Sequence, residues 1–96
     1  MSKKGYLYIL ASGRNGTLYI GSTSNLVKRI EEHRQKLVDG FTKRYDIAKL
    51  VYFEIFEDIK DAIVRERHLK KWERKWKTKL IQSANPYWRD LYEDIK

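Results

Sequence analysis

The stretch YLYILASGRNGTLYIG, which runs from Tyr6 to Gly21 in a chain of 96 residues, decides the fold. Its two ends, residues 6–11 and 17–21, are rich in aromatic and large aliphatic side chains, a composition typical of β-strands. The serine, glycines and asparagine between them are typical of a turn. The stretch therefore predicts a β-hairpin near the start of the chain.

The register of this hairpin decides where its tyrosines lie. A four-residue loop over residues 12–15 would set Tyr8 opposite Tyr19 on one sheet face, and the two glycines leave the register open by one residue. Tyrosines in small sheets usually bury their rings in the core. A catalytic tyrosine must instead lose its proton near neutral pH, which requires an arginine, a lysine or a metal beside it. Arg29 would supply that charge if the following helix packs on the same face.

The rest of the chain adds one strand and several helices. The expected elements are a helix over residues 25–38 that stops near Gly40, a strand over 49–56, a helix over 59–79 capped by Asp58, and a last short helix with Asn85 as N-cap and Pro86 as first residue. The strand is apolar at both parities, which indicates cover on both faces. We expect an α/β fold of the α+β type: one domain over residues 1–96, with a small three-stranded antiparallel sheet and helices on both faces.

The composition of the chain limits the classes of molecule that it is expected to bind. The chain has 21 Lys and Arg against 13 Asp and Glu, a net charge of +8, which favours polyanions. Nucleic acid is the first candidate and an anionic membrane surface the second. The absence of cysteine excludes disulfides, zinc sites with thiolate ligands and thiol catalysis. The sequence shows no apolar signal core and no apolar run long enough to cross a bilayer, so we expect a cytoplasmic protein.

One carboxylate falls among apolar positions of the expected helix over 59–79. Glu66 lies on the helical stripe formed by Ile59, Ala62, Ile63, Leu69 and Trp76. A charge placed there is costly unless it meets a cation, a metal or several hydrogen-bond donors. One interpretation is a salt bridge to a nearby arginine. The other is a ligand for Mg²⁺, which often takes only one or two carboxylates.

The same helix carries a dense run of basic side chains. They are Arg65, Arg67, Lys70, Lys71, Arg74, Lys75, Lys77 and Lys79. The run predicts a surface that follows a phosphate backbone, with binding that weakens as salt rises. Of the two tryptophans within it, we expect Trp72 to be able to stack on an unpaired base and Trp76 to lie in the core. Lys43 and Arg44 add a second, weaker patch in the connector.

Arg29 and His33 are neighbours on one side of the first helix, since they lie four residues apart. They could bind a phosphate together, although such basic pairs are usually solvated surface. A zinc site at His33 has little support, because the second histidine, His68, stands at no metal-binding spacing from it.

Together these residues resemble the GIY-YIG nuclease family. The resemblance rests on Tyr6-Leu7-Tyr8, Tyr19-Ile20-Gly21, Arg29, His33 and Glu66 in that order. Tyr8 and Tyr19 are eleven residues apart, and Arg29 follows Tyr19 by ten. The first motif departs from the family pattern, because its glycine and isoleucine are replaced. Residues 85–91 are similar to the Asn-Pro-x-Trp-x-Asp-Leu of a short, stand-alone bacterial branch.

The resemblance implies a three-stranded antiparallel sheet flanked by helices and one active site. By resemblance that site is lined by Tyr8, Tyr19, Arg29, His33, Glu66 and Asn85. It implies an endonuclease in which Glu66 holds one Mg²⁺ or Mn²⁺, Tyr19 with Tyr8 activates water, and Arg29 stabilises charge on phosphorus. The substrate is nucleic acid, with DNA favoured over RNA. Asn85 is also explained as a helix cap before Pro86.

Two other functions compete with this one. A non-catalytic module that binds nucleic acid through the basic helix over 65–79 would account for the charge, although it leaves Glu66 unexplained. A protein of the membrane surface is a more distant alternative, since Glu66 and Glu73 interrupt the apolar face that such a helix needs.

Overall fold

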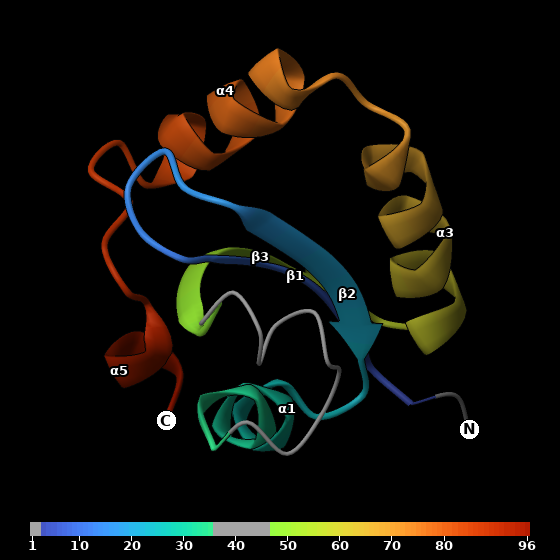
Figure 1. Ribbon diagram of the computed structural model, residues 1–96. Helices are drawn as coiled ribbons and strands as arrows, with labels where there is room; N and C mark the ends of the chain where they lie inside the picture. Colours follow the sequence, from blue (N-terminus) through green and yellow to red (C-terminus); the bar gives the residue numbers. More distant parts are fainter. Residues whose placement is uncertain (1–2, 36–46) are drawn as a thin grey trace.

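Three antiparallel strands and their helices form the fold in the computed structural model, which describes residues 3–35 and 47–96. The elements are β1 (Gly5–Ala11), β2 (Leu18–Thr23), α1 (Leu26–Arg34), β3 (Lys49–Phe56), α3 (Ile59–Lys70), α4 (Arg74–Ala84) and α5 (Tyr92–Ile95). The strand order is β2-β1-β3, so β1 lies in the centre. In Figure 1, α1 covers one face of the sheet, and α3 and α4 cover the other. The expected fold class is confirmed.

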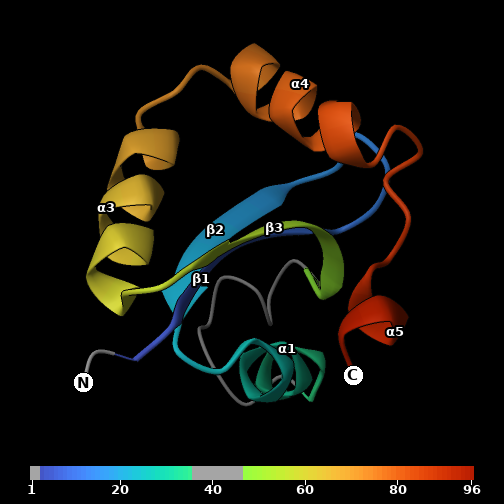
Figure 2. The same ribbon diagram turned by 180° about the vertical axis from the view of Figure 1, so that it is seen from behind.

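Each face of the sheet buries its own apolar cluster. Leu7 and Ile9 of β1 point toward α3 and α4, where they join Leu69, Ile81 and other buried side chains. The alternate residues of β1 point toward α1 and join Leu26, Ile30 and Leu50. Successive side chains of a strand face opposite sides of a sheet, so a central strand that is apolar throughout needs helices on both. Figure 2 shows this layering from behind.

The loop of the hairpin has six residues and not the expected four. Ala11 pairs with Leu18, and the loop over residues 12–17 is closed by a hydrogen bond of 3.0 Å from Ser12 N to Thr17 O. Tyr8 therefore pairs with Gly21 and not with Tyr19, so the expected register was wrong by two residues. The physical reason is the six-residue loop, in which the Ser12 hydroxyl also accepts from Thr17 N. A shift of two residues keeps both tyrosines on one face.

The single helix expected over 59–79 is two helices. α3 ends at Lys70, α4 begins at Arg74, and the chain between them makes tighter bonds from Lys71 N to His68 O and from Trp72 N to Leu69 O. A straight helix of that length would extend about 32 Å, beyond strands of six to eight residues. The break returns α4 to the sheet.

The break between α3 and α4 also decides how far Trp72 and Trp76 are buried. Trp76 is 47% exposed, whereas Trp72 is half-buried and packs against the core cluster. The expectation that Trp76 lies in the core was wrong, because it assumed one continuous helical face through residues 71–73. Stacking of a base on Trp72 stays a prediction.

The first helix begins as expected, whereas the last helix does not begin at Pro86: α5 starts at Tyr92, because Asn85 and the residues after it bind the edge of β3. α1 starts after Asn25, whose side chain accepts from Lys28 N, as expected for an N-cap. It ends at Arg34 with Gln35 as its C-cap, and residues 36–38 of the expected helix, with Lys43 and Arg44 beyond them, lie outside the described residues. Asn85 ends α4 as its C-cap, so its expected role as an N-cap was wrong. Within the described residues, none of the helices has the length and apolar character to span a bilayer.

Candidate active site

The phenol of Tyr8 lies over the backbone of β2. Tyr8 is 2% exposed, and a Cβ placed on Gly21 would come within 2.5 Å of its hydroxyl oxygen. Real Cβ atoms do not approach so closely, so residue 21 must lack a side chain for Tyr8 to hold this position. The register that pairs Tyr8 with Gly21 thus directs the hydroxyl toward the edge strand.

Tyr8, Tyr19 and His33 form an aromatic cluster between the sheet and α1. The Tyr8 hydroxyl and His33 Nε2 are 3.2 Å apart, and the ring of His33 lies 5.3 Å from that of Tyr19. The two tyrosine rings are 6.4 Å apart. His33 is 2% exposed, so it faces inward from its helix. The sheet and α1 therefore hold two hydroxyls and an imidazole together, a combination suited to orienting water and moving a proton.

Arg29 lies one helical turn before His33 and is more exposed. Its Nε is 3.6 Å from the Glu32 carboxylate, and 40% of its side chain is exposed. Arg29 and Glu32 line a small pocket of about 160 Å³ together with Thr23, Ser24, Asn25 and Lys28. An exposed ion pair of this length is weak. The guanidinium can therefore exchange its carboxylate partner for a phosphate.

Glu66 approaches β2 from the opposite face of the sheet. Its Oε1 accepts a hydrogen bond of 2.5 Å from the Ser22 hydroxyl, and its Oε2 accepts one of 2.6 Å from Lys70 Nζ. Only 20% of its side chain is exposed. The expected alternative of a salt bridge is thus realised with a lysine. Because Ser22 directly follows Gly21, the carboxylate and the Tyr8 phenol meet the edge strand at adjacent residues.

The donor set around Glu66 limits the metals that fit it. Across residues 3–35 and 47–96, no three His, Cys, Asp or Glu side chains lie close enough together to hold a metal ion. Zinc, which takes three or four nitrogen, sulfur or carboxylate ligands from the protein, does not fit. Mg²⁺ and Mn²⁺ do fit one carboxylate, since Mg²⁺ takes most of its ligands from water and substrate phosphate. Such an ion would have to replace the Lys70 ammonium at Oε2.

Sequence reasoning missed Ser22. Ser22 is not among the predicted site residues, although it belongs to β2. The alternation of the strand could have identified it. Since Tyr19 and Gly21 share one face, Ser22 must point to the other, toward the helix that carries Glu66.

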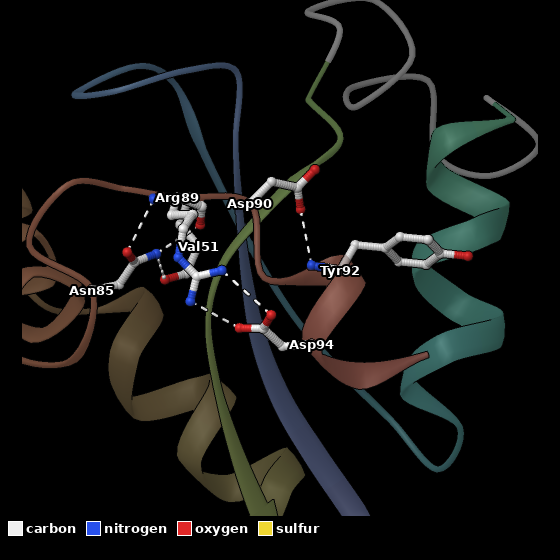
Figure 3. Close-up of polar contacts among 6 residues, drawn as sticks. All are labelled: Val51, Asn85, Arg89, Asp90, Tyr92 and Asp94. Carbon is white, nitrogen blue, oxygen red and sulfur yellow. Dashed lines mark hydrogen bonds and ion pairs between the residues drawn. The ribbon is translucent and has the colours of Figure 1, made fainter.

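Asn85 lies at the other edge of the sheet (Figure 3). Its amide donates to Val51 O at 3.0 Å and to Arg89 O at 2.7 Å, and its carbonyl oxygen accepts from Arg89 N at 3.0 Å. Val51 is the extra residue of β3 where Ile9 pairs with Tyr52 but Leu10 pairs with Leu50. A bulge leaves backbone groups without a ladder partner, and Asn85 binds one of them.

The residues after Asn85 continue this edge contact. Leu91 N donates to Leu50 O at 2.8 Å, and Asp90 Oδ1 accepts from Leu50 N at 3.2 Å. Trp88, which lies between Asn85 and Asp90 in the sequence, is fully buried in the core cluster. Residues 85–91 therefore cover the outer edge of β3, and the structure gives Asn85 a structural role at the edge away from β2.

The predicted nucleic-acid-binding residues that can be located all lie on the surface. Arg67, Lys70, Lys71, Arg74 and Lys75 are exposed on α3, on α4 and between them. Arg74 also donates to Asn15 O and Gly16 O, at 3.0 and 2.6 Å, and so holds the hairpin loop against α4.

Arg65 belongs to a separate network. Its guanidinium donates to both carboxylate oxygens of Glu54, at 2.9 and 3.0 Å, and the Tyr52 hydroxyl donates to the same carboxylate. Burial favours a higher pKa for Glu54, but hydrogen bonds from Arg65 and Tyr52 outweigh it and the pKa is lowered. Burial raises the pKa of Tyr52, and the adjacent carboxylate raises it further. This network packs α3 on β3.

Known proteins resemble the chain in sequence and in structure. The family model described as the GIY-YIG catalytic domain matches residues 4–79. A UPF0213 protein of Clostridium perfringens is 42% identical over 80 residues, which cover 83% of this chain and 85% of the relative. A UPF0213 protein of Syntrophus aciditrophicus is 38% identical over 84 residues, covering 86% of this chain and 94% of the relative.

A solved structure gives the corresponding result for the fold. The solution NMR structure of a UPF0213 protein from Bacillus halodurans has a TM-score of 0.56 to this chain at 25% identity, and the match covers 91% of this chain and 92% of that one. The matched family region contains the tyrosine and histidine cluster, Arg29 and Glu66, and it ends before Asn85.

Proposed function

The chain belongs to the GIY-YIG family of nuclease domains, and from that premise we propose that it is a metal-dependent endonuclease acting on phosphodiester bonds, in DNA rather than RNA. One observation supports the proposal most. A buried phenol and a half-buried carboxylate meet adjacent residues, Gly21 and Ser22, from the two faces of the sheet. Acid-base groups and a metal ligand at one strand are what phosphodiester hydrolysis requires.

The aromatic cluster would handle the attacking water. Tyr19, acting as the phenolate and assisted by Tyr8, orients this water and accepts its proton, so that the phenol is restored as the hydroxide attacks. His33, 3.2 Å from the Tyr8 hydroxyl, fixes the direction of that phenol. Arg29, exposed one turn away, stabilises the negative charge that develops on the phosphate.

Glu66 would hold Mg²⁺ or Mn²⁺, and Ser22 would set the direction of the carboxylate. A cation held there would supply Lewis-acid stabilisation of the negative charge that develops on the phosphate and on the leaving oxygen. Lys70 Nζ, which donates to Glu66 Oε2, would then bind a substrate phosphate in place of this carboxylate. The products would carry a 5′-phosphate and a 3′-hydroxyl.

The Lys70 contact also supports a second candidate, a binding module without catalysis. An ammonium at 2.6 Å compensates the charge of Glu66 without any metal. In that case Glu66 is a structural ion-pair partner, and the exposed basic side chains of α3 and α4 account for the function.

Cleavage by matched variants separates the two candidates. Wild type, Glu66→Gln and Ser22→Ala are incubated with supercoiled plasmid and with labelled single strands in Mg²⁺, Mn²⁺ or EDTA, while binding is measured in parallel. We expect metal-dependent cleavage by the wild type, a loss of about 100-fold or more in Glu66→Gln, and unchanged binding. Ser22→Ala should raise the metal concentration needed for half-maximal cleavage by roughly tenfold. Glu57→Gln, at an exposed position of the loop before α3, is the matched control.

Two results would count against the nuclease. If folded wild type binds but cuts none of these substrates in any metal, the binding module replaces it. If Glu66→Gln cuts as fast as Glu57→Gln, Glu66 is not the metal ligand.

A further inference from the structure

An exposed tryptophan stands on α4 among lysines. Trp76 is 47% exposed, and the Nζ atoms of Lys75 and Lys79 lie 5.4 and 4.9 Å from the centre of its ring. Tryptophan is among the side chains that gain most from burial, so an exposed indole marks a contact surface more often than an exposed small side chain does.

Trp76 also borders a hollow where α3 turns into α4. Lys71, Trp72, Glu73 and Trp76 line this space of about 450 Å³, here called the elbow pocket. Trp72 forms a fixed part of it, because its ring packs against the core and lies 5.3 Å from the Arg65 guanidinium. The pocket therefore combines one anchored indole with one exposed indole, and its volume is in the range of small-ligand sites.

The charge around the elbow pocket favours an anion. Lys71 lines the pocket, and Lys75 and Lys79 lie over the ring of Trp76. Glu73 is the one acidic side chain among the described residues that line the pocket, and its contact with Lys75 is 3.7 Å long. Both partners of that ion pair are largely exposed, at 74% for Glu73 and 66% for Lys75, so the pair is weak. An aromatic face beside lysines is the arrangement by which proteins bind a base and its phosphates in a single strand.

We propose that the elbow pocket binds one unpaired base of a single-stranded segment, with the base stacked on Trp76 and the adjoining phosphates against Lys75 and Lys79. Lys71 follows Glu66 by five residues, about 7.5 Å along a helix axis. The elbow pocket and the candidate metal ligand are therefore less than two helical turns apart along the chain. The inference rests on the proposed function for its choice of nucleic acid as partner, and it adds that the substrate contains a single-stranded region.

The proposal is tested by comparing the affinity of the protein for two strands of equal charge, one with bases and one without. Labelled 12-nucleotide oligothymidine and an abasic oligomer of the same length are titrated in EDTA, where metal-dependent cleavage cannot occur. We expect wild type to bind oligothymidine about tenfold more tightly. Trp76→Leu keeps apolar bulk but no aromatic face, so it should lose this preference and bind the abasic strand unchanged. Trp76→Phe should keep most of it.

Control variants complete the design. Tyr87→Leu removes another exposed aromatic ring, 76% exposed, and should leave the preference intact. Glu66→Gln should also leave it intact, because it removes the metal ligand and not the pocket. Circular dichroism of each variant checks the fold.

The outcomes separate the pocket from the nuclease. Equal affinity of wild type for both strands overturns the proposal, as does a preference that survives in Trp76→Leu, and so does a failure of every strand to bind at low salt. If the preference for oligothymidine depends on Trp76 but the protein never cuts, the base-binding pocket is supported and the nuclease function is rejected. Binding to anionic vesicles but to neither strand would assign the surface to a membrane and overturn the proposal.

Discussion

Replacement of Asn85 by alanine should destabilise the protein by about 3 kcal/mol, because three hydrogen bonds of a buried amide are lost at roughly 1 kcal/mol each. The bonds join Asn85 to Val51 O, Arg89 O and Arg89 N, and the residue is only 6% exposed. Asn85→Asp should cost at least as much, since a carboxylate oxygen would then face the two carbonyl oxygens. These values are a large part of the stability of a small domain.

Urea denaturation followed by circular dichroism measures this loss. The matched control is Gln82→Ala, which removes an amide from the exposed side of the same helix and should change stability by less than about 0.5 kcal/mol. Thermal unfolding should show a fall in Tm of roughly 10 °C or more for Asn85→Ala. Cleavage measured well below that temperature should persist if the residue only closes the edge of β3.

Two results would contradict a purely structural role for Asn85. If Asn85→Ala is as stable as Gln82→Ala, the three hydrogen bonds do not hold the edge of the sheet. If it is also inactive while fully folded, Asn85 belongs to the catalytic site, as the resemblance alone implied.

Two other changes follow from contacts described above. Gly21→Ala places a methyl group 2.5 Å from the Tyr8 hydroxyl, so it should lower the free energy of unfolding by about 1–3 kcal/mol and reduce cleavage. The control is Gly13→Ala, which should do neither, because nothing lies within 4 Å of the added methyl group. Equal urea midpoints for the two variants would contradict the contact between Tyr8 and Gly21. The pKa of Glu54 is lowered in the fold, so its carboxylate stabilises the protein above the ordinary value of 4.5, and this contribution is lost as the pH falls through the lowered value. Glu54→Gln should therefore flatten the acid side of a plot of urea midpoint against pH, and an equally steep fall in the variant would refute the assignment.

Local pattern was enough to predict the hairpin, the sheet and the position of Glu66. Residues that alternate or recur with helical spacing carry this information in a short window. The register was harder, because it depends on a loop closed by Ser12 and Thr17 whose hydrogen bonds no periodicity reveals. An error of two residues left Tyr8 and Tyr19 on their shared face, so the candidate site survived it.

The break between α3 and α4 shows what local pattern lacks. No glycine or proline lies between Lys70 and Arg74, and the helical wheel therefore continued through them. The end of the helix is set by the size of the sheet on which both helices pack, a property of the whole fold. The exposure of Trp76 and the burial of Trp72 depend on that break.

Ser22 and Asn85 illustrate the same difference at the candidate site. Ser22 carries no local signal of its role, and Asn85 before Pro86 has the local signal of a helix cap. Their partners, Glu66 and Val51, are 44 and 34 residues distant along the chain. Only the folded chain connects them.

The contact between Tyr8 and Gly21 means that the two short motifs of the hairpin are not independent signatures. A side chain at position 21 and a phenol at position 8 compete for the same volume, so substitutions at these positions should be energetically coupled in a double-mutant cycle. Gly21→Ala should cost much less when Tyr8 is already leucine. In a collection of related sequences the two positions should change together, and a chain that has lost the glycine should be suspected of having lost the tyrosine's task as well.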